Sequence, residues 1–308
     1  MARKLRLQFP GASYHVINRG NYRRDVFESE RTAGAFEQTL GETCLSFGWQ
    51  LHAFVIMRNH FHLALTTPTP NLVEGMHWLQ ATFAIRFNRF RSENGHLFQG
   101  RYRALIIEDG HALARVVDYI HLNPVRAKIV PPSGVSTFRH SSLPRYLASS
   151  RPNWLMAENW LTHRGLDDSP EGWRRYLGSL ATACETKAGA MIGQHGEFSC
   201  GWAIGTAGWR KALAQNHSHL ALEMDVQAAE IRDFKEARWS AALAKTLHEA
   251  RRTTAEAVVA PKGVAWKVSI ARRLRREAGA PYSWIVRALT MGSPGAVRVA
   301  VCRMGKAN

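Results

Sequence analysis

The sequence is poor in cysteine and contains no long apolar run. Its 4 cysteines form no CxxC pair and no other spacing typical of zinc ligands. This excludes a disulfide scaffold and a zinc finger, and it favours buried thiols in a reducing compartment. No stretch reaches the roughly 18 apolar residues of a membrane span, and the first residues lack the apolar segment of a signal peptide. We therefore expect a cytoplasmic protein that does not enter a membrane.

Acidic residues are also scarce relative to basic ones. The chain holds 41 Lys and Arg against 24 Asp and Glu, a formal net charge of +17. The excess lies at the two ends, because residues 1–150 carry +8, residues 151–260 carry 0 and residues 261–308 carry +9. A single basic block is often only a solvated surface, but two blocks that flank a neutral region favour a polyanionic partner. Nucleic acid is the favoured partner.

The length predicts more than one domain. A chain of 308 residues, 45% of them apolar, is expected to form two or three. We place an α+β domain at 1–150, a mainly helical region without an assigned role at 151–260, and a basic segment at 261–308. In that segment two short helices flank a turn at Met291-Gly292-Ser293, which is typical of a helix-turn-helix. A generic three-helix bundle is the alternative.

The first 130 residues alternate between strand and helix periodicity. Asn71 and Glu74 have the spacing of a capping box at the start of a helix. The expected strands are 13–19, 49–57, 60–66 and 101–108, and the expected helices are 29–47, 72–90 and 112–122. This order predicts an antiparallel four-stranded sheet with its helices on one face, the ferredoxin-like or split-βαβ arrangement. The other face would be open for a ligand.

Two local spacings in this domain carry chemistry. Side chains alternate between the faces of a strand, so His60 and His62 point the same way. A four-residue step on the last helix puts Tyr119 and Asn123 on one side, and Pro124 places Asn123 at the helix end. Together these groups can hold one metal beside one nucleophile. A lone histidine or tyrosine is more often an ordinary hydrogen-bonded group, and this is how we interpret His15, His52 and His121.

Sequence motifs of a known family occur in four segments, which are Tyr14–Asn21, His52–Leu63, Phe98–Tyr102 and Tyr119–Ala127. In this order they resemble the single-tyrosine HUH transposases of the insertion-sequence type, and among these the REP-associated tyrosine transposases. The resemblance covers residues 5–146. It implies that His60, His62 and Asn123 bind a divalent metal and that Tyr119 is the nucleophile. Arg58 stands where many relatives carry proline, which alters the turn before His60 but removes no ligand.

The resemblance implies a metal-dependent single-stranded DNA endonuclease and strand transferase that recognises hairpin, REP-like DNA. Attack by the tyrosine would leave a 5′-phosphotyrosine and a free 3′-hydroxyl, so cleavage should be reversible. A phenol is protonated at neutral pH, so attack needs nearby positive charge, and a metal would stabilise charge on the phosphate. Two imidazoles suit zinc or manganese, whereas an amide oxygen suits magnesium or manganese. From the resemblance we expect Mg²⁺ or Mn²⁺.

Two other functions are compatible with parts of the sequence. A catalytically silent regulator could bind duplex DNA through residues 261–308, although retention of all four chemical residues argues against it. An RNA-binding module would fit the charge and the sheet but leaves the histidines unexplained. The expected partner is single-stranded or hairpin DNA, with duplex DNA at the C-terminal segment, and the protein is expected to be a monomer or a homodimer. Candidate DNA-binding residues are Arg19, Arg23, Arg24, Arg101, Arg103, Arg126, Lys267, Arg272 and Arg273.

Overall fold

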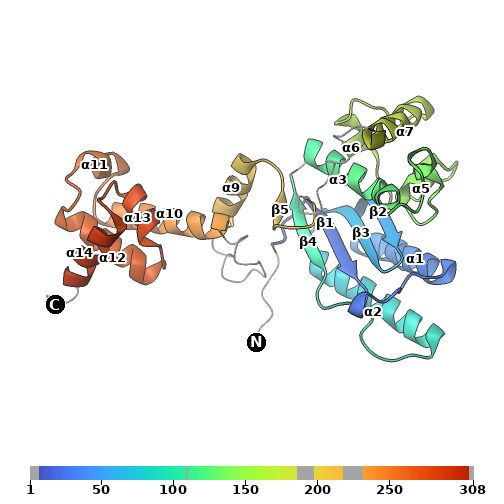
Figure 1. The fold of residues 1–308 in the computed structure, drawn as a ribbon, viewed down its shortest axis with the longest axis horizontal. Helices are drawn as coiled ribbons and strands as arrows, with labels where there is room; N and C mark the ends of the chain where they lie inside the picture. The colour runs from blue at the N-terminus through green and yellow to red at the C-terminus, as the bar shows by residue number, and fades with distance from the viewer. Residues whose placement is uncertain (1–6, 109, 186–197, 218–231, 305–308) are drawn as a thin grey trace. The chain divides into compact units, whose positions relative to one another are not determined.

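The computed structural model describes residues 7–108, 110–185, 198–217 and 232–304. These residues form two compact units, one of residues 8–206 and one of residues 207–304 together with Leu7 (Figure 1). The division differs from the boundaries predicted at 150 and 260, since it falls between Thr206 and Ala207. Within the described ranges, no helix is long and apolar enough to cross a bilayer.

A five-stranded sheet forms the centre of the first unit. β1 (Ala12–Arg19) pairs antiparallel with both β3 (His60–Thr67) and β4 (Arg103–Ile107), and β2 (Gln50–Met57) pairs antiparallel with β3. The order β2-β3-β1-β4 is ferredoxin-like, which confirms the predicted α+β class. The structure adds β5 (Ala203–Ile204), which runs parallel to β4. A strand of two residues is too short to show a periodic pattern in the sequence.

Segments of the same chain cover both edges of this sheet. At the β4 edge, the Ile106 and Glu108 amides donate to carbonyls of the β5 segment at 3.0 and 2.8 Å. At the β2 edge, the Ile56 amide donates to the His140 carbonyl at 2.8 Å, and Leu51 exchanges hydrogen bonds with residues 154–156. Backbone N–H and C=O groups that an edge strand would otherwise expose are therefore hydrogen-bonded within the chain.

Different helices cover the two faces of the sheet. α1 (Glu30–Phe47) and α2 (Leu72–Arg91) pack on the face that carries Phe61. There, the ring of Phe36 lies 4.7 Å from that of Phe61 and 5.1 Å from that of Phe83. α3 (His111–His121) packs on the opposite face, where Tyr119 meets His62. The prediction that all helices share one face is therefore wrong, because the helix that carries the tyrosine lies on the histidine face.

α2 begins without the predicted capping box. Asn71 makes no side-chain cap, and its Oδ1 instead accepts a hydrogen bond from Nε1 of Trp49 at 2.9 Å. The indole packs so closely on α2 that a Cβ at Gly75 would lie 2.2 Å from it. Glycine inside a helix costs about 1 kcal/mol relative to alanine. At this position the close approach of Trp49 requires it.

Residues after 123 complete the first unit. They form α4 (Asn123–Arg126), α5 (Ser142–Leu147), α6 (Glu158–Thr162) and α7 (Pro170–Glu185), with 3₁₀ turns at Asn21–Arg23 and Pro132–Thr137. His121 of α3 bonds through its two ring nitrogens to the hydroxyls of Tyr176 and Ser142, each at 2.8 Å. The Tyr176 ring lies 5.0 Å from that of Trp160. This aromatic packing explains why residues 151–206 belong to the first unit.

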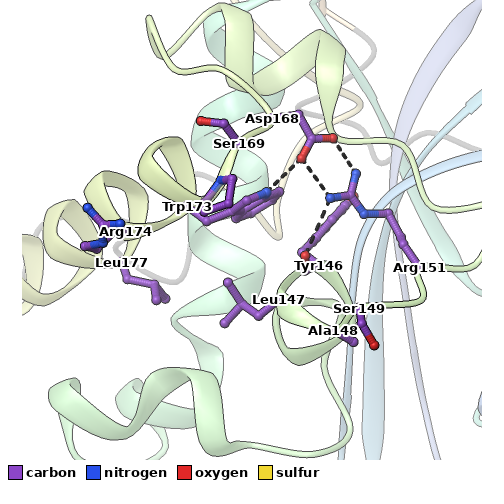
Figure 2. Close-up of a pocket in the computed structure, with 11 residues that line it drawn as sticks. Tyr146, Leu147, Ala148, Ser149, Arg151, Asp168, Ser169, Trp173, Arg174 and Leu177 are labelled. Carbon is purple, nitrogen blue, oxygen red and sulfur yellow. Dashed lines mark hydrogen bonds and ion pairs between the residues drawn. The ribbon is translucent and has the colours of Figure 1, made fainter.

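A pocket of about 580 Å³ lies between α5 and α7 (Figure 2). On its wall Asp168 accepts hydrogen bonds from the Arg151 guanidinium at 2.8 Å and from Nε1 of Trp173 at 2.7 Å. Trp173 in turn stacks on Tyr146, with ring centroids 4.8 Å apart. The hydrogen bond from Arg151 lowers the pKa of Asp168. Because the charges of Arg151 and Asp168 neutralise each other, we interpret this cluster as a packing contact between α5 and α7.

The elements described in the second unit are all helices. They form α9 (Ala207–Asn216), α10 (Arg232–Glu249), α11 (Thr254–Val259), α12 (Ala265–Glu277), α13 (Tyr282–Ala288) and α14 (Pro294–Met304). One apolar core joins α10 to α14 and includes Leu243, Leu247, Ile270, Leu274, Ile285, Leu289, Val297 and Val301. The predicted segment 261–308 therefore shares its core with α10 and α11. Of the predicted region 151–260, residues 186–197 and 218–231 lie outside the described residues.

Candidate active site

A pocket in the first unit brings the four predicted chemical residues together. It has a volume of about 470 Å³ and lies on the histidine face of the sheet. β3 supplies His60 and His62, α3 supplies Tyr119, and Asn123 follows the end of α3. The remaining lining residues are Ile17, Arg19, Met57, Arg126, Ala127 and Ser199.

The two histidines of β3 lie side by side, as strand alternation predicts. Their ring centroids are 5.2 Å apart and their planes meet at 78°. Nδ1 of His60 lies 2.8 Å from Oδ1 of Asn59. A carboxamide oxygen only accepts hydrogen bonds, so Nδ1 carries the proton. The Nε2 atom of His60 is therefore left with its lone pair.

His15, to which the sequence motifs assign no role, fixes the second histidine in the same way. It is fully buried on β1, and its Nδ1 lies 2.8 Å from the carbonyl oxygen of Phe198. Since that oxygen only accepts, Nδ1 of His15 is protonated and its Nε2 is an acceptor. This Nε2 lies 3.0 Å from Nδ1 of His62, which must donate. The lone pair of His62 is thereby assigned to Nε2, the arrangement typical of metal-binding histidines.

The Tyr119 side chain is surrounded by aromatic rings and by one guanidinium group. Its side chain is 3% exposed, and its ring lies 5.6 Å from that of His62 and 5.1 Å from that of Phe198. The guanidinium carbon of Arg126 lies 4.7 Å from the ring centroid. A guanidinium in this position makes a favourable cation–π contact with the ring and keeps a positive charge beside Tyr119.

Asn123 lies just beyond the end of α3, as predicted. α3 ends at His121, and Pro124 lies in the first turn of α4. The Asn123 Nδ2 donates to the carbonyl oxygen of Tyr119 at 3.1 Å. This hydrogen bond orients the carboxamide and leaves its Oδ1 as the acceptor atom at the pocket.

Burial keeps the imidazoles of the site neutral. It lowers the pKa of His60 to about 4, with a further contribution from the charge of Arg19. It lowers the pKa of His15 to about 4 against the opposing effect of the hydrogen bond to Phe198. The pKa of His62 also lies well below its ordinary value, first through burial and then through the neighbouring His15 and His60 and the arginines of the pocket. Neutral imidazole is the form that binds metal, so the three rings are in the required state at pH 7.

The donor atoms of this pocket fit a divalent metal ion. His60 and His62 each present a neutral imidazole with a free Nε2, and Asn123 offers an amide oxygen. Within the described part of the chain, no group of three His, Cys, Asp or Glu side chains is placed to hold a metal. The amide is therefore needed for a third protein ligand. Mixed nitrogen and oxygen donors of this kind suit manganese, and the amide oxygen also suits magnesium.

Three of the arginines predicted to bind DNA lie at the pocket or next to it. Arg19 and Arg126 line it. Arg103 donates to the carbonyl oxygen of Ser199, a lining residue. Arg103 therefore holds the wall of the pocket and would have to leave this partner to contact a phosphate.

The other predicted arginines of this unit lie on its surface. Arg23 and Arg101 are exposed. Arg24 donates to the Glu93 carboxylate at 2.6 Å, so part of its charge is neutralised. Tyr22, between β1 and these arginines, is 93% exposed and has a φ of 51°. An exposed ring beside exposed cations is suited to stacking with an unpaired base, although periodicity did not identify it.

The basic residues predicted to bind DNA in α12 do not face solvent freely. Lys267 is buried, and its Nζ donates to the carbonyl oxygen of Ala260 at 2.8 Å. Arg272 donates to the carbonyl oxygen of Met304 at 3.3 Å. Arg273 forms ion pairs with two glutamates, Glu249 and Glu277. The prediction that these three side chains contact phosphates is wrong for Lys267 and is not supported for the two arginines, because each is engaged within its own unit.

Comparisons with known proteins give one matching family model and similar solved structures. The family model described as "Transposase IS200 like" matches residues 8–123. One similar solved structure is a REP-associated tyrosine transposase bound to a REP hairpin, with 18% identity, 52% of this chain and 91% of that chain covered, and a TM-score of 0.41. Another is a Deinococcus radiodurans R1 protein described as a transposase, with 21% identity, coverages of 42% and 92%, and a TM-score of 0.29. No curated protein matches the sequence. Residues 8–123, all of which lie in the first unit, are thus similar to the IS200-like transposase family.

Proposed function

We propose that the first unit is a metal-dependent single-stranded DNA endonuclease and strand transferase in which Tyr119 is the nucleophile. The observation that carries this proposal is the convergence of Tyr119, His60, His62 and Asn123 on one pocket. Each group has a necessary role there, since phosphoryl transfer needs a nucleophile and a means of stabilising charge on the phosphate. The motifs shared with REP-associated transposases favour a DNA hairpin with unpaired flanks as the substrate.

In the proposed reaction Oη of Tyr119 attacks a phosphorus atom of the unpaired strand, and the bond from that phosphorus to O3′ breaks. The products are a 5′-phosphotyrosine and a 3′-hydroxyl, and the proton lost by the phenol balances the proton gained by the leaving oxygen. Arg126, whose guanidinium lies over the tyrosine ring, places positive charge beside the nucleophile. Mg²⁺ or Mn²⁺ held by His60, His62 and Asn123 would supply positive charge to the phosphate.

The covalent step makes strand transfer possible without ATP. A phosphotyrosine ester keeps the energy of the phosphodiester it replaces, so a second 3′-hydroxyl can attack it by the reverse reaction. Arg19, on the same wall as His60, is placed to orient the phosphate during both steps. A nuclease of this kind joins strands as readily as it cuts them.

A covalent adduct tests the proposal directly. Hairpin oligonucleotides with randomised unpaired flanks are incubated with the full chain and Mn²⁺, and protein that carries DNA is isolated under denaturing conditions. A label at the 3′ end should remain with the protein, whereas a label at the 5′ end should be released. Tyr119→Phe removes one oxygen and little volume, so it should abolish the adduct while DNA binding survives.

The matched control is Tyr282→Phe, the same change at a tyrosine of the second unit. It should form as much adduct as the unmodified protein. Undiminished adduct in Tyr119→Phe would overturn the assignment of the nucleophile. Hairpin binding without any adduct would instead favour the alternative function, a catalytically silent DNA-binding regulator.

A further inference from the structure

The last two helices of the second unit form a helix-turn-helix. α13 and α14 are joined by residues 289–293, and within this turn Thr290 has a φ of 49° while Met291 is buried in the core. Oγ of Ser293 accepts a hydrogen bond from the Ala296 amide at 3.2 Å, which fixes the start of α14. A short helix, a tight turn with a buried apolar residue and a longer second helix match the DNA-binding motif, in which the second helix reads the DNA.

The two sides of α14 differ in character. Val297 and Val301 are buried in the core of the unit. The opposite side is exposed and presents small or short side chains between two cations. Gly295, Val299 and Cys302 lie along its middle, and Arg298 and Arg303 lie along its borders. Because the side chains along the middle of this face are short, the backbone of α14 can approach another surface closely.

The charges of the unit are distributed unevenly between its helices. The arginines of α12 are engaged with glutamates or with backbone carbonyls, namely Arg272, Arg273, Arg275 and Arg276. By contrast, α13 and α14 contain no acidic residue. Their three arginines, Arg287, Arg298 and Arg303, are exposed, and no ion pair between described residues involves them.

We infer that the exposed face of α14 binds duplex DNA in the major groove. The groove of B-DNA admits one α-helix, and an apolar face bordered by unpaired arginines complements a groove lined by phosphates. The N-terminal half of such a helix meets the bases, which assigns Arg298 and the Val299 methyl groups to base edges. Arg303, in the last turn, and Arg287, on α13, are assigned to phosphates. This site binds paired DNA, in contrast to the proposed active site, which acts on an unpaired strand.

Binding of the full chain to duplex DNA tests the inference. Preferred sequences are selected from a random duplex pool, and affinity is then measured by fluorescence anisotropy at several salt concentrations. Arg298→Gln should weaken binding by about fivefold or more and relax the sequence preference, because a base contact is lost. Arg303→Gln should weaken binding to all sequences and reduce the slope of log affinity against log salt by about 1. Arg276→Gln, the same change at an engaged arginine of α12, should leave duplex affinity unchanged.

A second pair of variants uses two exposed valines of the same unit. Val299 on α14 is 50% exposed and Val258 on α11 is 65% exposed. Val299→Asp should abolish duplex binding by placing a negative charge against the groove, whereas Val258→Asp should not, and neither should unfold the unit. Equal duplex affinity in the Val299→Asp and Val258→Asp proteins would overturn the inference, as would an absence of duplex binding at low salt. Adduct formation on hairpin DNA is measured in parallel, so failure here is distinguishable from failure of the Tyr119 proposal.

Discussion

His62 shows how two neighbours define the chemistry of one side chain. Phe198 accepts from His15, and His15 accepts from His62, so each proton along this relay has one position. Burial keeps the rings neutral, and the only lone pair left on His62 belongs to Nε2. A ligand whose tautomer is fixed before the metal arrives loses little freedom on binding.

Replacing His15 should therefore weaken metal binding. His15→Leu leaves Nδ1 of His62 without its acceptor and should lower Mn²⁺ affinity by about tenfold or more, the scale expected for a supporting group of a metal ligand. His15→Gln keeps an acceptor for His62 and a donor for the carbonyl oxygen of Phe198, so its Mn²⁺ affinity should fall less than that of His15→Leu. Titration calorimetry without DNA measures the affinity, and ¹⁵N shifts of His62 report its tautomer.

The reference for this comparison is His62→Ala, which should lose affinity at least as severely as His15→Leu. Should His15→Leu bind Mn²⁺ like the unmodified protein, with the His62 tautomer unchanged, the relay would have only a packing role. Recovery in His15→Gln separates hydrogen bonding from packing, because leucine is close in volume and only glutamine can form both bonds.

At the scale of elements, close packing between α2 and the sheet edge can be tested at two glycines. Gly75→Ala would place a Cβ 2.2 Å from the Trp49 indole, so it should lower the free energy of unfolding by about 1–3 kcal/mol, as overpacking does. Gly34→Ala in α1 meets no atom within 4 Å and should raise it by about 0.5–1 kcal/mol through helix propensity. Urea unfolding measures both variants. Equal effects at the two positions would mean that Trp49 yields to the added methyl group.

Periodicity predicted elements whose pattern extends over several residues. The alternation around Phe61 and the helical stripe of Phe36 and Phe83 were sufficient to predict the sheet, α1 and α2. Alternation along β3 predicts that His60 and His62 share a face, but it does not relate them to His15 on β1. The rings of His15 and His62 come together only through the register of the two strands, in which His62 pairs with Ile17. Sequence patterns do not specify register across non-local strands.

Other predictions failed because the residue interacts with a different partner than the sequence pattern indicated. Asn71 has the spacing of a cap, yet the indole of Trp49 takes its oxygen. Lys267 lies three and seven residues before Ile270 and Leu274, so the helical stripe itself places it on the buried face of α12. The spacing of Lys267 from these apolar residues was visible in the sequence, and it determines the location of the side chain more than its charge does. No sequence pattern indicated the role of Phe198, because it accepts the hydrogen bond from His15 through its backbone carbonyl oxygen, a group that every residue has.

For the whole molecule, buried histidines predict that acid weakens the fold. Burial lowers the pKa of His15 to about 4 and that of His121 to about 3, and His60 behaves like His15. Below the ordinary histidine pKa of 6.5 the unfolded chain takes up protons that the folded chain does not. The free energy of unfolding should therefore fall as the pH drops from about 6.5 to about 4, by up to about 1.4 kcal/mol per pH unit for each such group.

Urea unfolding in EDTA at a series of pH values measures this effect. At pH 7 and above, these histidines are neutral in both states, and their contribution does not change with pH. His121→Asn removes one of the groups and should flatten the dependence, even if it lowers stability at pH 7. A dependence as steep in His121→Asn as in the unmodified chain would show that other groups dominate.

The division into two units predicts where the chain tolerates truncation. A fragment of residues 1–206 keeps the sheet, α7 and the Phe198 contact, so it should fold and form the hairpin adduct. A fragment of residues 1–260 keeps Leu243 and Leu247 without the α12 and α13 residues that cover them. It should expose apolar surface and aggregate. Size-exclusion chromatography and adduct formation compare the two, and a soluble, monomeric 1–260 fragment would contradict the prediction.

The covered edges of the sheet have a consequence for assembly. Residues 202–204 occupy the edge of β4, and segments near residues 140 and 155 occupy that of β2, so the described chain leaves little ladder for a second copy to extend. Two copies would have to meet through helix surfaces, and each would already hold its own Tyr119 against its own His62. On the proposed mechanism, one bound molecule would therefore carry all the groups needed to cut a strand. The number of strand breaks should follow the number of molecules on the DNA rather than the number of pairs.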